Sequence, residues 1–275
     1  MKRTVFFISD STGITAETLG DSLLAHFDQL EFEKVVFPYT DTPEKAHAAV
    51  DRINQAADRD GAPPIVFDTV VYEPIRAIIA ESRGYILDIF SMFLPVLDKA
   101  LSIKHNLNVG RGDKATDNQN YQNRINAVHY ALDNDDGGNI NRYDQADLIL
   151  VGVSRSGKTP TCLYLALQSG IYAANYPLTE DDLHGSSLPK PLQAHRNKLF
   201  GLTIEPRRLV AIREERKPGS RYASITQCED EIRMAKSLFS RHQIPFLDST
   251  HISVEEIATR ILLETGLRRQ GKSVV

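Results

Sequence analysis

A short segment near the middle of the chain combines glycines, a lysine and hydroxyl side chains at a spacing that suits phosphate binding. Residues 152–159 read Gly-Val-Ser-Arg-Ser-Gly-Lys-Thr, which fits the pattern G-x-x-x-x-G-K-[ST]. In such a loop the glycines let the backbone curl until successive N–H groups point at phosphate oxygens, and the following helix adds its positive end. The predicted nucleotide-binding residues are Gly152, Val153, Ser154, Arg155, Ser156, Gly157, Lys158 and Thr159.

Two side chains at the end of this loop would bind the phosphate and its metal ion. Lys158 would reach the terminal phosphate, and the Thr159 hydroxyl would ligate Mg²⁺. An apolar run at 148–151 precedes the loop and an amphipathic run beginning at Pro160 follows it, which predicts a buried strand and then a helix. An ordinary glycine-containing turn with an exposed lysine is the alternative, and the complete pattern between these flanks argues against it.

Two further polar segments could bind anions or metal. Asp135 and Asp136 lie in the turn-like segment 134–138, where a carboxylate pair can hold Mg²⁺ or orient a hydroxyl but is more often a solvated turn. Asp10 lies in the Ser-Asp-Ser-Thr-Gly segment 9–13, before a predicted helix. The free N–H groups at a helix start favour anions, although ordinary capping by Ser or Thr is the more common reason for such a segment.

Arginines are densest between residues 207 and 221. Guanidinium groups grip phosphate in fork geometry, so one of them could close on a nucleotide. Glutamates interleave with them, which is equally typical of a solvated, internally paired helix. The arginines are Arg207, Arg208, Arg213, Arg216 and Arg221.

The elements that must position these residues alternate between strand and helix patterns. Predicted strands lie at 4–8, 32–39, 64–69, 85–88, 148–151, 171–176, 199–204 and 244–247. Predicted helices lie at 15–27, 44–57, 73–82, 91–101, 123–132, after Pro160, at 206–217 and 229–242, and after Ser253. This alternation predicts an α/β chain with parallel sheets covered by helices.

We predict three segments in this chain: an N-terminal parallel-sheet α/β unit at 1–101, a linker or functional loop at 102–120, and a P-loop kinase-like α/β unit at 121–275. Residues 181–194 read as a loop that could cover bound phosphates. The helix after the P-loop is predicted to bury Cys162, Leu163, Ala166 and Leu167. Whether the two units share one continuous sheet stays open.

Composition excludes several classes of partner. In 275 residues, 32 Lys and Arg stand against 36 Asp and Glu, so no basic field invites nucleic acid. The apolar runs are much shorter than the ~20 residues of a membrane helix, and no signal-peptide pattern is present. Cys162 and Cys228 show no metal-ligand spacing,. We therefore expect a cytoplasmic protein without nucleic-acid or membrane partners.

Several motifs together are more specific than the P-loop alone. They are residues 9–13, 135–137, 152–161, 174–177, 201–204 and 253–258. In this order they resemble, over nearly the whole chain, the phosphoenolpyruvate synthase (pyruvate, water dikinase) regulatory protein family, which is related to the pyruvate, phosphate dikinase regulatory proteins. The complete Gly157-Lys158-Thr159 and the segment 220–224 resemble the synthase branch. Asn134 departs from the pattern, since a histidine is expected there.

The resemblance implies a bifunctional enzyme. One reaction would transfer phosphate from ADP to a threonine of phosphoenolpyruvate synthase, inactivating it and releasing AMP. The other would use inorganic phosphate to remove that group and release pyrophosphate. Lys158 and the loop amides would stabilise the transferring group, and Thr159 would hold Mg²⁺. Asp136 or Asp135, and then Asp10, are the candidate catalytic bases. A homodimer is also implied.

Two other functions compete with this reading. A P-loop kinase of a small metabolite would share the strand-loop-helix pattern but use ATP. A non-catalytic nucleotide-sensing module would inhibit its partner by contact and leave the partner's threonine unmodified.

Overall fold

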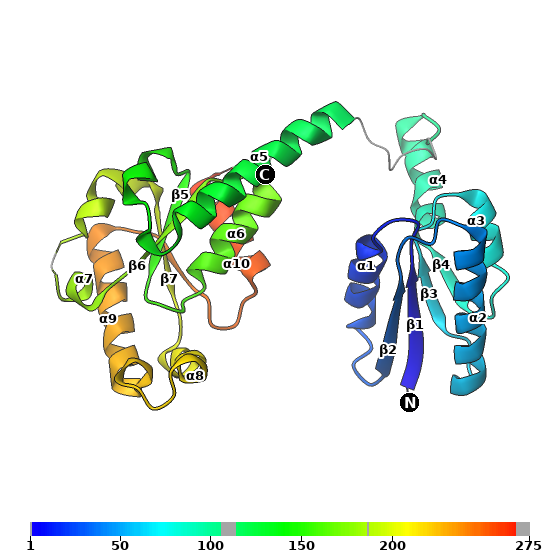
Figure 1. Ribbon diagram of the computed structural model, residues 1–275, viewed down its shortest axis with the longest axis horizontal. Helices are drawn as coiled ribbons and strands as arrows, with labels where there is room; N and C mark the ends of the chain where they lie inside the picture. The colour runs from blue at the N-terminus through cyan, green and yellow to red at the C-terminus, as the bar shows by residue number, and fades with distance from the viewer. Residues whose placement is uncertain (1, 106–113, 186, 268–275) are drawn as a thin grey trace. The chain divides into compact units, whose positions relative to one another are not determined.

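The computed structural model describes residues 2–105, 114–185 and 187–267. Contacts divide the chain into two compact units, Met1–Gly112 and Asp113–Val275, here called unit 1 and unit 2. Each unit contains a four-stranded sheet in which every described strand pair is parallel (Figure 1). The predicted α/β class is therefore confirmed, and the strands form two sheets rather than one.

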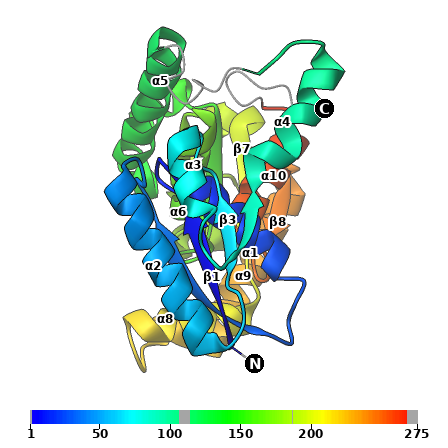
Figure 2. The same ribbon diagram turned by 90° about the vertical axis from the view of Figure 1, so that its right-hand side faces the viewer.

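In unit 1 the strand order is β2-β1-β3-β4. The strands are β1 (Lys2–Ile8), β2 (Glu31–Phe37), β3 (Ile65–Asp68) and β4 (Tyr85–Asp88). The helices are α1 (Ile14–Leu24), α2 (Pro43–Asp60), α3 (Glu73–Ile79) and α4 (Ile89–Leu101). Figure 2 shows α2 and α3 on one side of the strands and α1 on the other.

The central strand β1 is buried on both faces, which explains its continuous apolar sequence. Phe6 and Ile8 pack with residues of α2 and α3, whereas Val5 and Phe7 pack with residues of α1. Alternate side chains of a strand point to opposite faces, so one apolar run supplies two cores.

Asp68, at the end of β3, is a buried carboxylate with a perturbed pKa. Its side chain is only 2 % exposed, and burial, with smaller contributions from Asp88 and Asp10, raises its pKa to about 7,. The backbone N–H of Val70, which donates to Asp68 Oδ1 at 2.8 Å, and the charge of Arg76 oppose this rise.

Replacing Asp68 with asparagine is expected to flatten the pH dependence of stability. Because its folded-state pKa is raised, folded Asp68 holds a proton between about pH 4 and 7 that the unfolded chain has lost,. Its contribution to stability is thus present at low pH and falls as pH rises, by at most about 1.4 kcal/mol per unit. Urea unfolding of wild type and Asp68→Asn measures this pH dependence of stability. The measurements run from about pH 4.5 to about pH 8, which covers most of the window in which only folded Asp68 holds the proton.

The control is Asp51→Asn, because Asp51 is exposed on α2. Asp68→Asn should be more stable than wild type near pH 8, while Asp51→Asn should follow the wild-type pH profile. The same slope in wild type and Asp68→Asn would contradict the assignment.

In unit 2 the strand order is β6-β5-β7-β8. The strands are β5 (Leu148–Gly152), β6 (Ala173–Pro177), β7 (Leu199–Thr203) and β8 (Phe246–Asp248). The α-helices are α5 (Lys114–Asp133), α6 (Lys158–Ser169), α7 (Glu180–His184), α8 (Pro206–Arg216), α9 (Ile225–His242) and α10 (Val254–Thr265). Short 3₁₀ segments are η1 (Asp135–Gly137), η2 (Ile140–Gln145), η3 (Lys190–Lys198) and η4 (Arg221–Ala223).

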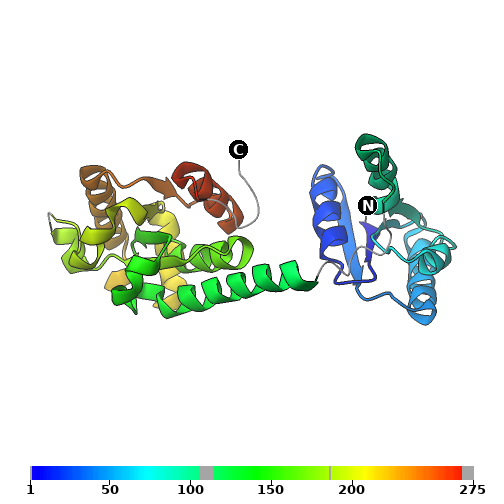
Figure 3. The ribbon, with the colours of Figure 1, turned by 90° about the horizontal axis from the view of Figure 1, so that it is seen from above.

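The sheet of unit 2 also lies between two helical layers. Leu148 and Leu150 of β5 pack in a core with residues of α6 and α10, and Ile149 and Val151 pack in a core with residues of α9. Because β5 packs in both cores, the loop that follows it is anchored in two cores. Figure 3 shows the long α5, drawn in green, along the side of this unit.

Several element boundaries differ from the sequence predictions. The helix α5 begins at Lys114, inside the segment 102–120 predicted as a linker or loop, of which residues 106–113 lie outside the described residues. The segment 181–194 is not a continuous loop, because α7 and η3 occupy most of it. In α6 Leu167 is 50 % exposed and Leu165 is buried instead, because Leu165 lies three residues after the buried Cys162 on the same helix face, whereas Leu167 lies five residues after it,.

Within the described part of the chain, no helix combines the length and hydropathy needed to cross a membrane.

Candidate active site

The loop 152–157 connects β5 to α6, as the sequence predicts, and backbone geometry explains both glycines. A Cβ on Gly152 would lie 2.4 Å from the carbonyl oxygen of Leu202 in the adjacent β7, so only glycine fits there. Gly157 caps α6 with φ +92°, a left-handed conformation that favours glycine,. Arg155 also has a positive φ, 74°, so the loop contains a strained non-glycine residue.

The carbonyl oxygens of the loop are held by donors from the protein. Val153 O accepts from Lys158 Nζ at 2.9 Å, and Ser154 O accepts from the guanidinium of Arg213 at 3.1 Å. Ser156 O accepts from Ser249 Oγ at 3.0 Å. Carbonyl oxygens repel anions, so engaging them with donors favours a loop whose N–H groups are available to phosphate.

Lys158 lies at the start of α6 and folds back over the loop. Its side chain is buried, with 4 % exposed, and burial lowers its pKa from 10.5 to about 8,. The charge of Asp136 is the largest contribution opposing this shift, followed by Cys162 and Asp135, while Arg213 adds to it. Of the candidate carboxylates, Asp136 therefore has the strongest electrostatic interaction with Lys158.

Asp135 and Thr159, which are far apart in the sequence, meet in this site. The Thr159 hydroxyl donates to Asp135 Oδ1 at 2.8 Å, which brings together two of the hard oxygen ligands that Mg²⁺ prefers. Mg²⁺ commonly uses one or two protein oxygens together with substrate phosphates. The pair therefore fits the predicted magnesium site, and the remaining ligands would come from the nucleotide and water.

Asn175 of β6 fixes the carboxylate turn, a role that the sequence analysis missed. Its buried side chain donates from Nδ2 to Asp135 Oδ1 and accepts from the backbone N–H of Asp136 at 3.0 Å. Its own backbone N–H donates to Asn134 O at 3.3 Å. The available signal was a polar amide within an otherwise apolar strand, because a buried amide needs hydrogen-bond partners.

Asp136 itself is exposed, in contrast to Asp135. Its backbone has φ 47°, and Gly137 after it has φ +72°, so the turn carries two successive left-handed residues. Among the described residues its carboxylate accepts no hydrogen bond. An exposed carboxylate without a hydrogen-bond donor among the described residues, on a turn fixed by Asn175, fits the predicted role of catalytic base.

Asp10 lies in unit 1, directly after β1. Its Oδ2 accepts from the backbone N–H of Val71 at 2.9 Å. The strand before Asp10, β1, and the strand before the loop 152–157, β5, belong to different sheets. A catalytic role for Asp10 therefore stays a prediction.

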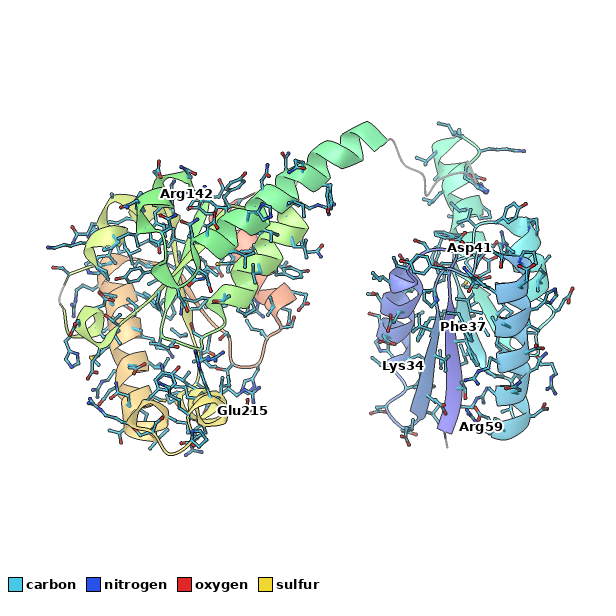
Figure 4. The ribbon with its side chains drawn as sticks, in the orientation of Figure 1. Lys34, Phe37, Asp41, Arg59, Arg142 and Glu215 are labelled. Atoms are coloured by element: carbon cyan, nitrogen blue, oxygen red, sulfur yellow. The ribbon has the colours of Figure 1, made fainter. Side chains whose placement is uncertain are left out.

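The arginine-rich segment divides into buried and exposed members. Arg213 is fully buried and pairs with Glu231 at 2.6 Å. Arg221 is exposed and pairs with Glu180 at 2.9 Å. Figure 4 labels Glu215 on the same helix as Arg213, where it is exposed. The interpretation as an internally paired surface helix thus holds for part of the segment, but Arg213 contacts the phosphate loop directly.

Replacing Asn175 with alanine is expected to weaken phosphoryl transfer about 10- to 100-fold, as loss of a residue that orients metal ligands typically does. The change frees Asp135 and leaves the N–H of Asp136 without its acceptor. Transfer rates measured over a range of Mg²⁺ concentrations should show a higher Mg²⁺ requirement. Gln193→Ala is the control, because Gln193 hydrogen-bonds only the Leu188 carbonyl among the described residues.

Wild-type Mg²⁺ dependence in Asn175→Ala would contradict this role of Asn175. A loss of stability of about 1–3 kcal/mol is also expected, because a buried donor loses its partner. Urea unfolding separates this effect from the change in metal dependence.

Comparison with known proteins identifies the family of this chain. The sequence profile of the kinase/pyrophosphorylase family matches residues 5–262. Proteins named "Putative phosphoenolpyruvate synthase regulatory protein" from Pseudomonas putida (strain W619) and Pseudomonas aeruginosa (strain LESB58) are 60% and 59% identical over 272 residues. The alignments cover 99% of this chain and 100% and 99% of those proteins. The chain therefore belongs to the kinase/pyrophosphorylase family.

Proposed function

We propose that this protein regulates phosphoenolpyruvate synthase by reversible phosphorylation of a threonine, with ADP as phosphoryl donor and inorganic phosphate as the acceptor in the reverse direction. The observation that carries the proposal is the arrangement around the phosphate loop. Lys158, the Thr159–Asp135 pair and the exposed Asp136 lie at one place in unit 2. The names of the relatives supply the protein substrate.

In the kinase direction the threonine hydroxyl of the synthase attacks the β-phosphorus of ADP. Asp136 accepts the hydroxyl proton as the new P–O bond forms, and the bond between the β-phosphorus and the bridging oxygen breaks to release AMP. Lys158 and the loop N–H groups stabilise the negative charge on the transferring group. Bound Mg²⁺, held by Thr159 and Asp135, would neutralise phosphate charge.

In the reverse direction an oxygen of inorganic phosphate attacks the phosphorus of the phosphothreonine. The P–Oγ bond breaks, Asp136 returns the proton to the threonine oxygen, and pyrophosphate leaves. The same groups serve both directions, because each reaction passes one phosphoryl group between an anionic phosphate and a hydroxyl. One site can therefore perform both transfers.

Mass spectrometry of the synthase tests the proposal. Incubation with this protein, ADP and Mg²⁺ should add one phosphoryl group to a single threonine and produce AMP. Subsequent phosphate should remove the group and produce pyrophosphate. Consumption of ATP alone with an unmodified synthase would indicate a small-metabolite kinase, and inactivation with an unmodified threonine would indicate a non-catalytic module.

The proposal also includes a cellular location and an oligomeric state. A regulator of a metabolic enzyme would act in the cytoplasm with that enzyme. A homodimer is the proposed assembly, and light scattering of the purified protein measures it. A monomeric mass would overturn the dimer without affecting the proposed reaction.

A further inference from the structure

Arg213 is a fully buried cation behind the phosphate loop. It lies on α8, its side chain has no solvent exposure, and its guanidinium pairs with Glu231 Oε2 of α9 at 2.6 Å. Removing a guanidinium from water costs several kcal/mol unless its donors are satisfied. One terminal nitrogen donates to Glu231 and to the loop, the other donates to Tyr222 O and to Cys228 Sγ, and Nε is buried without a partner among the described residues.

The guanidinium of Arg213 binds the loop residue Ser154. One terminal nitrogen donates to Ser154 O at 3.1 Å, and the other donates to Tyr222 O at 2.9 Å. The guanidinium also stacks over the Tyr222 ring, 4.1 Å from its centroid, and the Tyr222 hydroxyl lies 2.9 Å from Ser154 Oγ. Ser154 is thus held at its backbone by Arg213 and at its side chain by Tyr222.

The residue after Ser154 shows why this anchoring matters. Arg155 has φ 74°, a left-handed conformation that costs a non-glycine residue about 1–2 kcal/mol. Such strain persists only where the surrounding structure determines it. Ser154 is anchored before Arg155, and Ser249 holds Ser156 O after it, so the strained bend is fixed on both sides.

We propose that Arg213 is a positioning residue that holds the phosphate loop in its anion-binding conformation through Ser154, with Glu231 fixing the direction of the guanidinium and Tyr222 completing the clamp. Arg213 does not touch the phosphate in this arrangement. It sets the path of the Ser154–Arg155 backbone and thereby the direction of the N–H groups that follow. This inference rests on the proposed function only where the KM values of the transfer reaction are measured; the ADP affinities do not depend on it.

Three substitutions test the clamp at increasing severity. Tyr222→Phe removes the hydroxyl that contacts Ser154 and keeps the stacked ring, Arg213→Lys keeps the charge without the planar fork, and Arg213→Met removes both. ADP affinity by calorimetry should fall slightly in Tyr222→Phe. In the two Arg213 variants it should fall about 10- to 100-fold, the range expected when binding groups are displaced by about an ångström.

A kinetic signature separates positioning from general destabilisation. KM for ADP should rise in the Arg213 variants, while KM for the protein substrate stays at the wild-type value. Leu238→Ala is the matched control, because Leu238 is buried on α9, seven residues after Glu231, and its truncation costs about 2–5 kcal/mol. Assayed below its unfolding transition, Leu238→Ala should bind ADP like wild type.

The outcomes are separable. Wild-type ADP affinity in Arg213→Lys, or loss of affinity in Leu238→Ala equal to that in Arg213→Lys, would overturn the positioning role. If Arg213→Met fails to fold, Arg213→Lys and Tyr222→Phe decide by the same criteria. A wild-type protein that binds ADP but leaves the synthase unmodified would overturn the proposed function. The ADP affinities of the Arg213 variants would still decide the positioning role of Arg213.

Discussion

Replacing Lys158 with methionine is expected to slow phosphoryl transfer from ADP by at least about 10²- to 10³-fold, the size of effect seen when one group that stabilises transition-state charge is removed. Lys158 directly follows the loop 152–157, and its ammonium lies 2.9 Å from Val153 O of that loop. The rate of AMP formation with the synthase as substrate measures the loss.

Methionine is preferable to alanine at this position because of burial. The Lys158 side chain is only 4 % exposed. Alanine would leave a void, whereas methionine keeps most of the stem volume without a charge. Lys158→Met should therefore fold at least as stably as wild type, and circular dichroism during thermal unfolding measures this.

Lys217→Met is the matched control, since Lys217 is exposed at the end of α8. It should transfer phosphate at the wild-type rate. Transfer at the wild-type rate in Lys158→Met itself would mean that the loop is not the catalytic centre.

The second large effect is expected for Asp136→Asn, which should slow transfer in the kinase direction about 10²- to 10⁴-fold, as for loss of a general base. The asparagine cannot accept the threonine proton. Nucleotide binding should change little, because the Asp136 carboxylate is exposed and the backbone N–H that anchors the turn on Asn175 remains. Single-turnover rates and ADP calorimetry on the same variant separate the two effects.

Asp135→Asn provides the comparison within the same turn. Asp135 accepts hydrogen bonds from Thr159 and Asn175, so its loss should raise the Mg²⁺ requirement and be relieved in part by added Mg²⁺. Asp136→Asn should not be relieved by Mg²⁺. The opposite pattern, with added Mg²⁺ restoring Asp136→Asn, would exchange the two roles.

Local patterns predicted the secondary structure well where each residue's role depends on its neighbours in the chain. The apolar runs of β1 and β5, the glycines of the phosphate loop and the capping box at Ser253 all act over a few residues. The predicted burial in α6 was wrong at Leu167, which lies five residues after the buried Cys162 and so faces away from the core, whereas Leu165 lies three residues after Cys162 on the buried face,.

Tertiary contacts decided what periodicity could not. Asn175 lies in a strand and appears in the sequence as one polar residue among apolar ones, yet it binds the Asp135 carboxylate and the Asp136 backbone N–H of a turn that is distant in the chain. Arg213 read equally well as a solvated surface arginine, because only its contacts with Glu231 and Ser154 show that it is buried.

The sequence by itself determined that the chain is an α/β protein in which a glycine-containing loop lies between a buried strand and a helix, since loop spacing and apolar periodicity are local properties. Only the tertiary structure decided that Asp135 meets Thr159, that Asp136 stays exposed, and that β1 and β5 lie in separate sheets. These facts depend on hydrogen bonds and strand pairing between residues far apart in the chain, which no local pattern encodes.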